Sequence, residues 1–205
     1  MSQEFANPPS RSLALPKPWH QIWWTALTRP SVAAYVALAD DPHATSQRAY
    51  GWLVWSGLIS GALFGMGFSR SADLPFPGLC FGLPLGALAG LLAIAFMAWI
   101  TQRIASALGG SGAYSRLVYL LAAFNAPLML VSMPLNSFSH PALSVLSIGL
   151  GLYGLALTVL SVKAVNRFGW GRAIGSCSPL LAVTLCLLAL GALAIVLDML
   201  SAAAV

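Results

Sequence analysis

Apolar residues gather into five long stretches, separated by short polar or glycine- and proline-containing segments. Each stretch approaches the ~20 residues that an α-helix needs to cross the hydrocarbon core of a bilayer. The five predicted spans lie at residues 52–68, 80–100, 117–134, 143–162 and 179–200. The pattern predicts an all-α fold in which residues 51–205 form a polytopic membrane protein, a five-helix transmembrane bundle.

The chain before the first span has a different pattern and is not expected to cross the membrane. Residues 1–16 are rich in Pro and Ser and are predicted to be disordered. Within residues 17–50, apolar side chains recur at the spacing of one helical face, and Pro30 is expected to begin a second helix. The candidate interfacial anchor consists of Trp19, Ile22, Trp23, Trp24 and Leu27.

Two interpretations of this segment are open. Tryptophan-rich amphipathic helices often lie in the plane of the membrane surface. The same apolar face can also pack against the protein's own spans. The sequence favours neither, and residues 17–50 are therefore predicted only to be cytoplasmic, interfacial amphipathic helices that precede the bundle.

Basic residues alternate from one connection to the next. Nine of the ten Lys and Arg residues fall on the side that holds the N-terminus, and one falls on the other side. Because cytoplasmic loops carry the excess of Lys and Arg, the N-terminus is predicted to be cytoplasmic and the C-terminus external. The composition looks bacterial, which would place the chain in the inner membrane with the C-terminus in the periplasm.

Composition excludes several classes of protein. Only 7% of residues are charged and 59% are hydrophobic, with a mean hydropathy of +0.83. Soluble domains carry about 25% charged residues, so lipid is the expected surroundings of much of this surface. The basic residues are too sparse for the clustered phosphate contacts that nucleic-acid binding requires.

Glycines recur every four residues in two consecutive spans. Such stripes let helix backbones approach closely in a bilayer. The candidate packing faces are Gly57, Gly61 and Gly65 in the first span, Gly82, Gly86 and Gly90 in the second, and Gly151 in the fourth. Contact between the two stripes within one chain is favoured over a dimer interface, although a homo-oligomer stays possible.

Asn125 lies near the middle of the third span, with Pro127 two residues further on. Proline removes a backbone donor and frees a carbonyl one turn earlier, so a structural kink is the favoured interpretation. The alternative is functional, because polar groups inside membranes often mark a substrate path.

No constellation of catalytic residues is visible. The cysteines form no CxxC pair, the histidines fall outside the spans, and no GxSxG motif occurs. Gly109-Gly110-Ser111-Gly112 lacks the GK[ST] ending of a phosphate-binding loop. We therefore predict no catalytic residues, no metal site, no cofactor and no enzymatic activity.

Several short motifs follow one another in a fixed order relative to the spans, over residues 19–200. They are residues 24–30 with Arg29-Pro30, the 108–114 glycine-then-tyrosine loop, Asn125-Ala126-Pro127, Leu152-Tyr153 and Arg172-Ala173. Together they resemble the Yip1-domain family, in particular its bacterial members. The resemblance implies an all-helical membrane domain with a cytosolic N-terminus.

Eukaryotic members of that family act in vesicle traffic, bind Rab-type GTPases and associate with other membrane proteins. The N-terminal region here lacks the Asp-Leu-Tyr-Gly-Pro motif of one eukaryotic branch, so the resemblance does not support GTPase binding. The predicted function is that of a non-enzymatic scaffold or adaptor in membrane organisation or trafficking-like processes, with the bilayer and other membrane proteins as partners. The alternatives are a small-solute transporter or channel, or an accessory subunit of a larger membrane complex.

Overall fold

The computed structural model describes residues 17–71, 77–136 and 141–203 of the chain. These residues form helices and short connections, and they contain no strand. The predicted disordered tail, residues 1–16, lies outside them. The helices are α1 (Trp19–Thr28), α2 (Val32–Ala39), α3 (Ser46–Ser71), α4 (Pro77–Ala107), α5 (Tyr114–Asn136), α6 (Pro141–Asn166), α7 (Trp170–Ser176) and α8 (Ser178–Ala203).

Four of these helices, α3 to α6, each contain a stretch long and apolar enough to cross a membrane. A fifth crossing is present if α7 and α8, which are bent by 60° at the break between them, count as one span. The five predicted spans each fall inside one of the long helices. The helices extend further than those spans, because the hydrogen-bonded backbone continues into polar residues at the helix ends.

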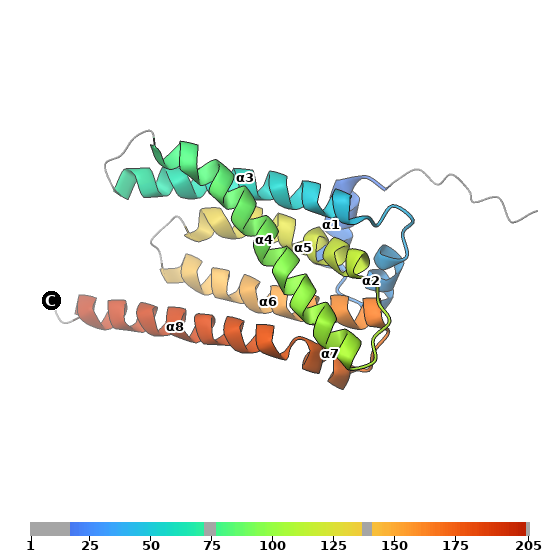
Figure 1. Cartoon of the computed structure of the whole chain (residues 1–205). Helices are drawn as coiled ribbons and strands as arrows, with labels where there is room; N and C mark the ends of the chain where they lie inside the picture. Colours follow the sequence, from blue (N-terminus) through green and yellow to red (C-terminus); the bar gives the residue numbers. More distant parts are fainter. Residues whose placement is uncertain (1–16, 72–76, 137–140, 204–205) are drawn as a thin grey trace, which may run out of the picture.

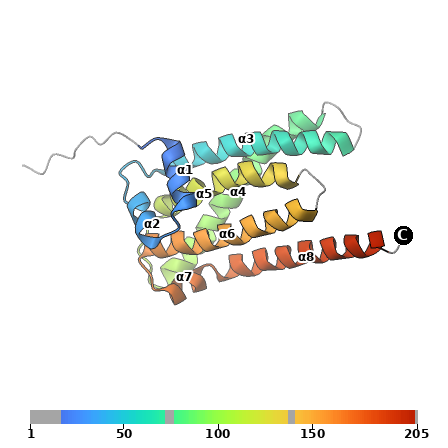
Figure 2. The same cartoon turned by 180° about the vertical axis from the view of Figure 1, so that it is seen from behind.

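The long helices run side by side, except that α4 crosses its neighbours obliquely (Figures 1 and 2). The short helices α1, α2 and α7 gather at one end of the bundle, and the C-terminus lies at the other end. Because successive long helices run in opposite directions, the connections with most of the basic residues all return to the end that holds α1 and α2. The alternation of basic residues along the chain therefore becomes a basic end in space.

Local capping sets the boundaries of the short helices. The Ser31 side chain accepts a hydrogen bond from the Ala34 amide (3.2 Å), which makes Ser31 the N-cap of α2. The expectation that Pro30 forms the first turn of this helix is wrong, since Pro30 lies in the connection before the cap. The long helix α4 ends before Gly109, which has a left-handed φ of 88°.

The core centres on the first half of α5. Every side chain from Leu117 to Phe124 is buried, including those on opposite sides of the helix. A helix that is apolar all round is stable where other helices surround it. Helices α1, α2, α3, α4 and α6 all contact α5, so this half of α5 is the centre around which the other elements are arranged.

Candidate functional site

The glycine stripes of α3 and α4 face each other within one chain, and we call this contact the glycine seam. A Cβ added at Gly86 would lie 2.5 Å from both the Gly57 carbonyl oxygen and the Gly61 Cα. A Cβ added at Gly82 would lie 3.0 Å from the Gly65 Cα. The facing atoms belong to the backbone, so no side-chain movement can make room, and only glycine permits this separation of the helices.

The other two candidate packing glycines lie outside the seam. A Cβ at Gly90 would meet the end of the Met129 side chain on α5, at 2.9 Å. Gly151 lines a cavity between α6 and its neighbours. The regular spacing along α4 therefore serves two different neighbours, α3 at Gly82 and Gly86 and α5 at Gly90.

The sequence-predicted interfacial anchor divides between two faces of α1. Ile22 is buried, and Trp23 and Leu27 pack partly buried against the bundle core. Trp24 lies on the outer face and is 70% exposed. Trp19 shares the face of Trp23, and their ring centroids lie 4.7 Å apart, but at the start of the helix it is still 53% exposed. The inner face of α1 thus contacts the protein's own helices, and two indole rings stay uncovered, one on the outer face and one at the start of the helix.

Hydrogen bonds from outside α1 hold its C-terminal half. The Tyr35 hydroxyl of α2 donates to the Ala26 carbonyl oxygen (2.9 Å), and the Tyr153 hydroxyl of α6 donates to the Leu27 carbonyl oxygen. Burial raises the pKa of Tyr35, so its hydroxyl stays protonated and remains a donor. We call α1 and α2 together the N-terminal cap, because they are tied to each other and to the end of the bundle.

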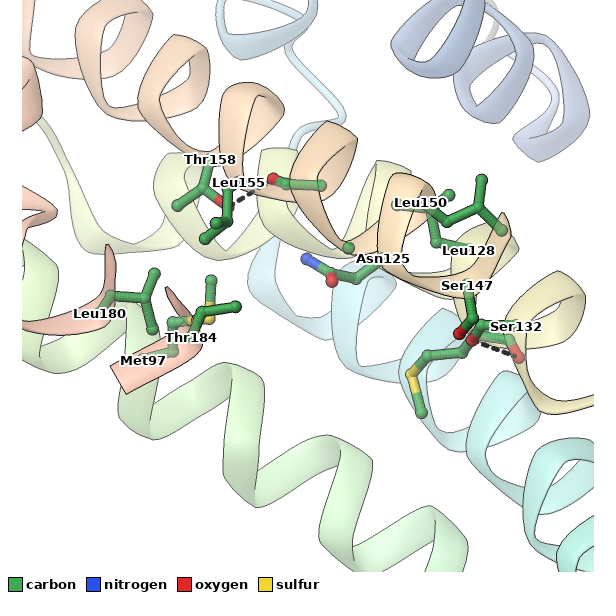
Figure 3. Close-up of a pocket in the computed structure, with 13 residues that line it drawn as sticks. Met97, Asn125, Leu128, Ser132, Ser147, Leu150, Leu155, Thr158, Leu180 and Thr184 are labelled. Atoms are coloured by element: carbon green, nitrogen blue, oxygen red, sulfur yellow. Dashed lines mark hydrogen bonds between the residues drawn. The ribbon is translucent and has the colours of Figure 1, made fainter. Parts of the chain in front are cut away.

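A cavity of about 360 Å³ lies between α4, α5, α6 and α8 (Figure 3). Asn125 points into the space that Met97, Thr158 and Thr184 also line. The Asn125 side-chain nitrogen donates to the Leu121 carbonyl oxygen (2.8 Å), and its side-chain oxygen has no partner among the described residues. The cavity is therefore apolar along much of its wall, with an uncompensated amide oxygen at mid-bundle.

Pro127 follows Asn125 without ending the helix, since α5 continues to Asn136. The carbonyl that Pro127 leaves without its usual amide partner belongs to Ala123. The Asn125 side chain instead bonds the Leu121 carbonyl. The Asn125 hydrogen bond therefore does not satisfy the carbonyl that Pro127 frees.

A buried polar cluster joins the ends of α4 and α6 to the loop before α5, and we call it the Gln–Asn clamp. The Gln102 side-chain amide donates to the Gly112 carbonyl oxygen (2.6 Å), and the Asn166 side-chain oxygen accepts from the Gly112 amide (3.1 Å). A Cβ at Gly110 or Gly112 would lie 2.5 or 2.7 Å from that Asn166 oxygen. Gly110 and Gly112 thus leave room for the close approach of Asn166, and the sequence alone predicted neither polar partner.

Acidic partners are scarce at the basic end. Asp40 pairs with Arg116 (3.2 Å) and lies 4.0 Å from Arg167, and all three side chains are substantially exposed. Exposed pairs of this kind contribute little to stability. Among the described residues, no three His, Cys, Asp or Glu side chains lie close enough together to hold a metal ion.

A bundle of long apolar helices with a short helical cap defines a polytopic helical membrane protein, and the predicted fold class is confirmed. The sequence model of the Yip1 domain family matches residues 13–191. The chain therefore belongs to the Yip1 domain family, a family of non-catalytic membrane proteins, and the resemblance drawn from its motifs is confirmed at the level of the family. No curated protein and no solved structure matches the chain.

Proposed function

We propose that this protein is a non-enzymatic membrane adaptor that binds partner proteins through the outer face of its N-terminal cap. The observation that carries the proposal is the exposure of Trp19 and Trp24 on a helix whose inner face is already occupied. Exposed tryptophans on a preorganised surface are typical anchors of protein interfaces. Insertion of the cap into lipid as an independent helix would instead require Ile22 to leave the bundle core.

The proposed location is a bacterial inner membrane, with the cap in the cytoplasm. The support comes from the distribution of charge, since nine of ten basic residues belong to connections on the side of the cap. The single exception is Arg70, near the C-terminal end of α3. If α7 and α8 cross the membrane once as a bent pair, the C-terminus is external.

Photo-crosslinking in native membranes tests the adaptor. A crosslinking residue in place of Trp24 is expected to capture the same protein in independent preparations. The matched control places it at Leu88 on α4, which is 52% exposed on an apolar helix and is expected to capture mainly lipid. Capture of lipid alone at both positions would contradict an adaptor role.

Co-purification distinguishes an adaptor from an accessory subunit. A subunit of a stable complex is expected to keep its partner in fixed stoichiometry after mild detergent extraction. An adaptor is expected to lose much of the partner, and Trp24→Ala should lose it further while leaving the melting temperature unchanged. The melting temperature serves as the control for folding, because Trp24 makes little contact with the bundle.

A second candidate function, transport of a small polar solute, is favoured by the cavity that reaches Asn125. An unpaired amide oxygen in hydrocarbon is costly. If the cavity is a transport path, we therefore expect water to reach the Asn125 side-chain oxygen. With Cys80, Cys177 and Cys186 replaced by serine, Thr184→Cys in the cavity wall is expected to react with a small water-soluble thiol reagent. Leu185→Cys, on the exposed neighbouring face of α8, is the lipid-facing control and should stay unreactive. Equal protection at both positions would remove the support for transport.

A further inference from the structure

A second cleft of about 360 Å³ lies at the capped end of the bundle, between the end of α4 and the start of α5. It is separate from both the N-terminal cap and the mid-bundle cavity, and none of its lining residues is acidic. The residues that line this α4–α5 cleft are Trp99, Gln102, Arg103, Ser106, Gly112 and Tyr114.

The α4–α5 cleft offers hydrogen-bond donors without a counter-charge. The Arg103 guanidinium lies over the Trp99 ring, with its Cζ 5.7 Å from the ring centroid. Among the described residues Arg103 has no carboxylate partner, and Asp40 is engaged by other arginines. The Ser106 hydroxyl, three residues along the same helix, has no hydrogen-bond partner in the described part of the chain either. An arginine with an adjacent free hydroxyl is suited to a phosphate, which accepts several charge-assisted hydrogen bonds.

The back wall of the cleft is fixed before any ligand arrives. Gln102 and Gly112 belong to the Gln–Asn clamp, with a hydrogen bond of 2.6 Å between them. The Tyr114 hydroxyl donates to the Ala95 carbonyl oxygen (3.2 Å), which holds the start of α5 against α4. A preorganised wall reduces the ordering cost of binding, so the remaining freedom lies mainly in the Arg103 side chain.

An apolar strip runs from this cleft along the outer face of α4. Trp99 stacks on Phe96 with ring centroids 6.1 Å apart, and Leu92 follows one turn further along the helix. Trp99, Phe96 and Leu92 are 49%, 61% and 57% exposed, so the strip is open along its length. Tryptophans with this mixture of exposure and apolar surroundings are typical of the headgroup level of a membrane.

We propose that the α4–α5 cleft binds the phosphate of an anionic lipid, with Arg103 and Ser106 on the headgroup and Phe96 and Leu92 along an acyl chain. Basic pockets between transmembrane helices at the membrane surface commonly bind anionic headgroups. A free phosphate would satisfy Arg103 equally well. The apolar strip that continues from the cleft favours a lipid, because only a molecule with a hydrocarbon tail would use both parts.

Native mass spectrometry of the full chain, purified in a neutral detergent, tests this site. With phosphatidylglycerol as the probe, we expect one lipid to be retained after detergent release, and phosphatidylcholine to be retained less. Arg103→Gln should reduce phosphatidylglycerol retention about tenfold, which corresponds to about 1.4 kcal/mol. Arg103→Lys should keep part of it, since lysine preserves the charge but not the planar fork.

The matched control is Arg172→Gln on α7, which removes the same charge at the same end of the bundle but lies outside the cleft. It should retain the lipid as the unsubstituted chain does. All three variants should have the melting temperature of the unsubstituted chain, because both arginines are exposed. Equal losses in Arg103→Gln and Arg172→Gln would show non-specific attraction and overturn the site, as would no loss in Arg103→Gln. Displacement of phosphatidylglycerol by millimolar inorganic phosphate would overturn the assignment to a lipid.

Discussion

Gly86→Ala is expected to destabilise the folded bundle by about 1–3 kcal/mol, the usual cost of forcing atoms into a packed core. The added methyl group would lie 2.5 Å from the Gly57 carbonyl oxygen and 2.5 Å from the Gly61 Cα. Both are backbone atoms, so the helices α3 and α4 must separate along the glycine seam. Helix association in a bilayer has no hydrophobic driving force, so it depends on the van der Waals contact that small residues allow between the backbones.

Gly149→Ala on α6 is the matched control, because a Cβ there has no neighbouring atom within 4 Å. Alanine also has a higher helix propensity than glycine by about 0.5–1 kcal/mol, so this control should be neutral or slightly stabilising. The measurement is the unfolding midpoint of the detergent-solubilised chain for both variants and the parent. Equal midpoints for Gly86→Ala and Gly149→Ala would show that α3 and α4 are not in close contact through these glycines.

The glycine spacing on α3 and α4 could be predicted from the sequence, and the partner of each stripe could not. The spacing is the same whether a stripe faces another helix of the chain or a second copy. Gly90 illustrates the limit, since it continues the stripe of α4 but faces Met129 on α5. Which neighbour a glycine meets depends on how the helices cross one another. The sequence of a single span does not determine that crossing.

For the amphipathic helix α1 too, the sequence predicts the helix but not the surface that its apolar face contacts. The spacing from Trp19 to Leu27 predicts a helix, and α1 is present at Trp19–Thr28. An apolar face has the same periodicity against lipid and against protein. The decisive contacts come from residues distant in sequence, such as the Tyr153 hydroxyl that donates to the Leu27 carbonyl oxygen.

Buried polar contacts are harder to predict from the sequence than the helices that carry them. In the sequence Asn125 is conspicuous because it lies inside an apolar span, whereas Asn166 lies at a helix end, where polar residues are common. Yet Asn166 is 5% exposed and engages both Gln102 and Gly112. The signal in the sequence is the glycine-rich loop 109–112, but the need for glycine at 110 and 112 follows only from the approach of Asn166.

The number of membrane crossings decides on which side of the membrane the C-terminus lies. Helices α3 to α6 are long and apolar enough for four crossings, and the bent pair α7–α8 adds a fifth only if α8 passes through the bilayer. The positive-inside rule favours that passage, because Lys163, Arg167 and Arg172 precede α8 and no Lys or Arg follows it. An even number of crossings would instead return the C-terminus to the side of the cap.

Reporters fused to the two ends of the chain therefore test the number of crossings and the side of the membrane on which the cap lies. We expect a phosphatase that is active only outside the cytoplasm to be active when fused after Val205 and inactive when fused before Met1. A fluorescent protein that matures only in the cytosol should give the opposite pattern. A cytosolic reporter signal after Val205, with the N-terminus also cytosolic, would contradict five crossings; an external N-terminus would contradict the placement of the cap, and with it the proposed adaptor surface.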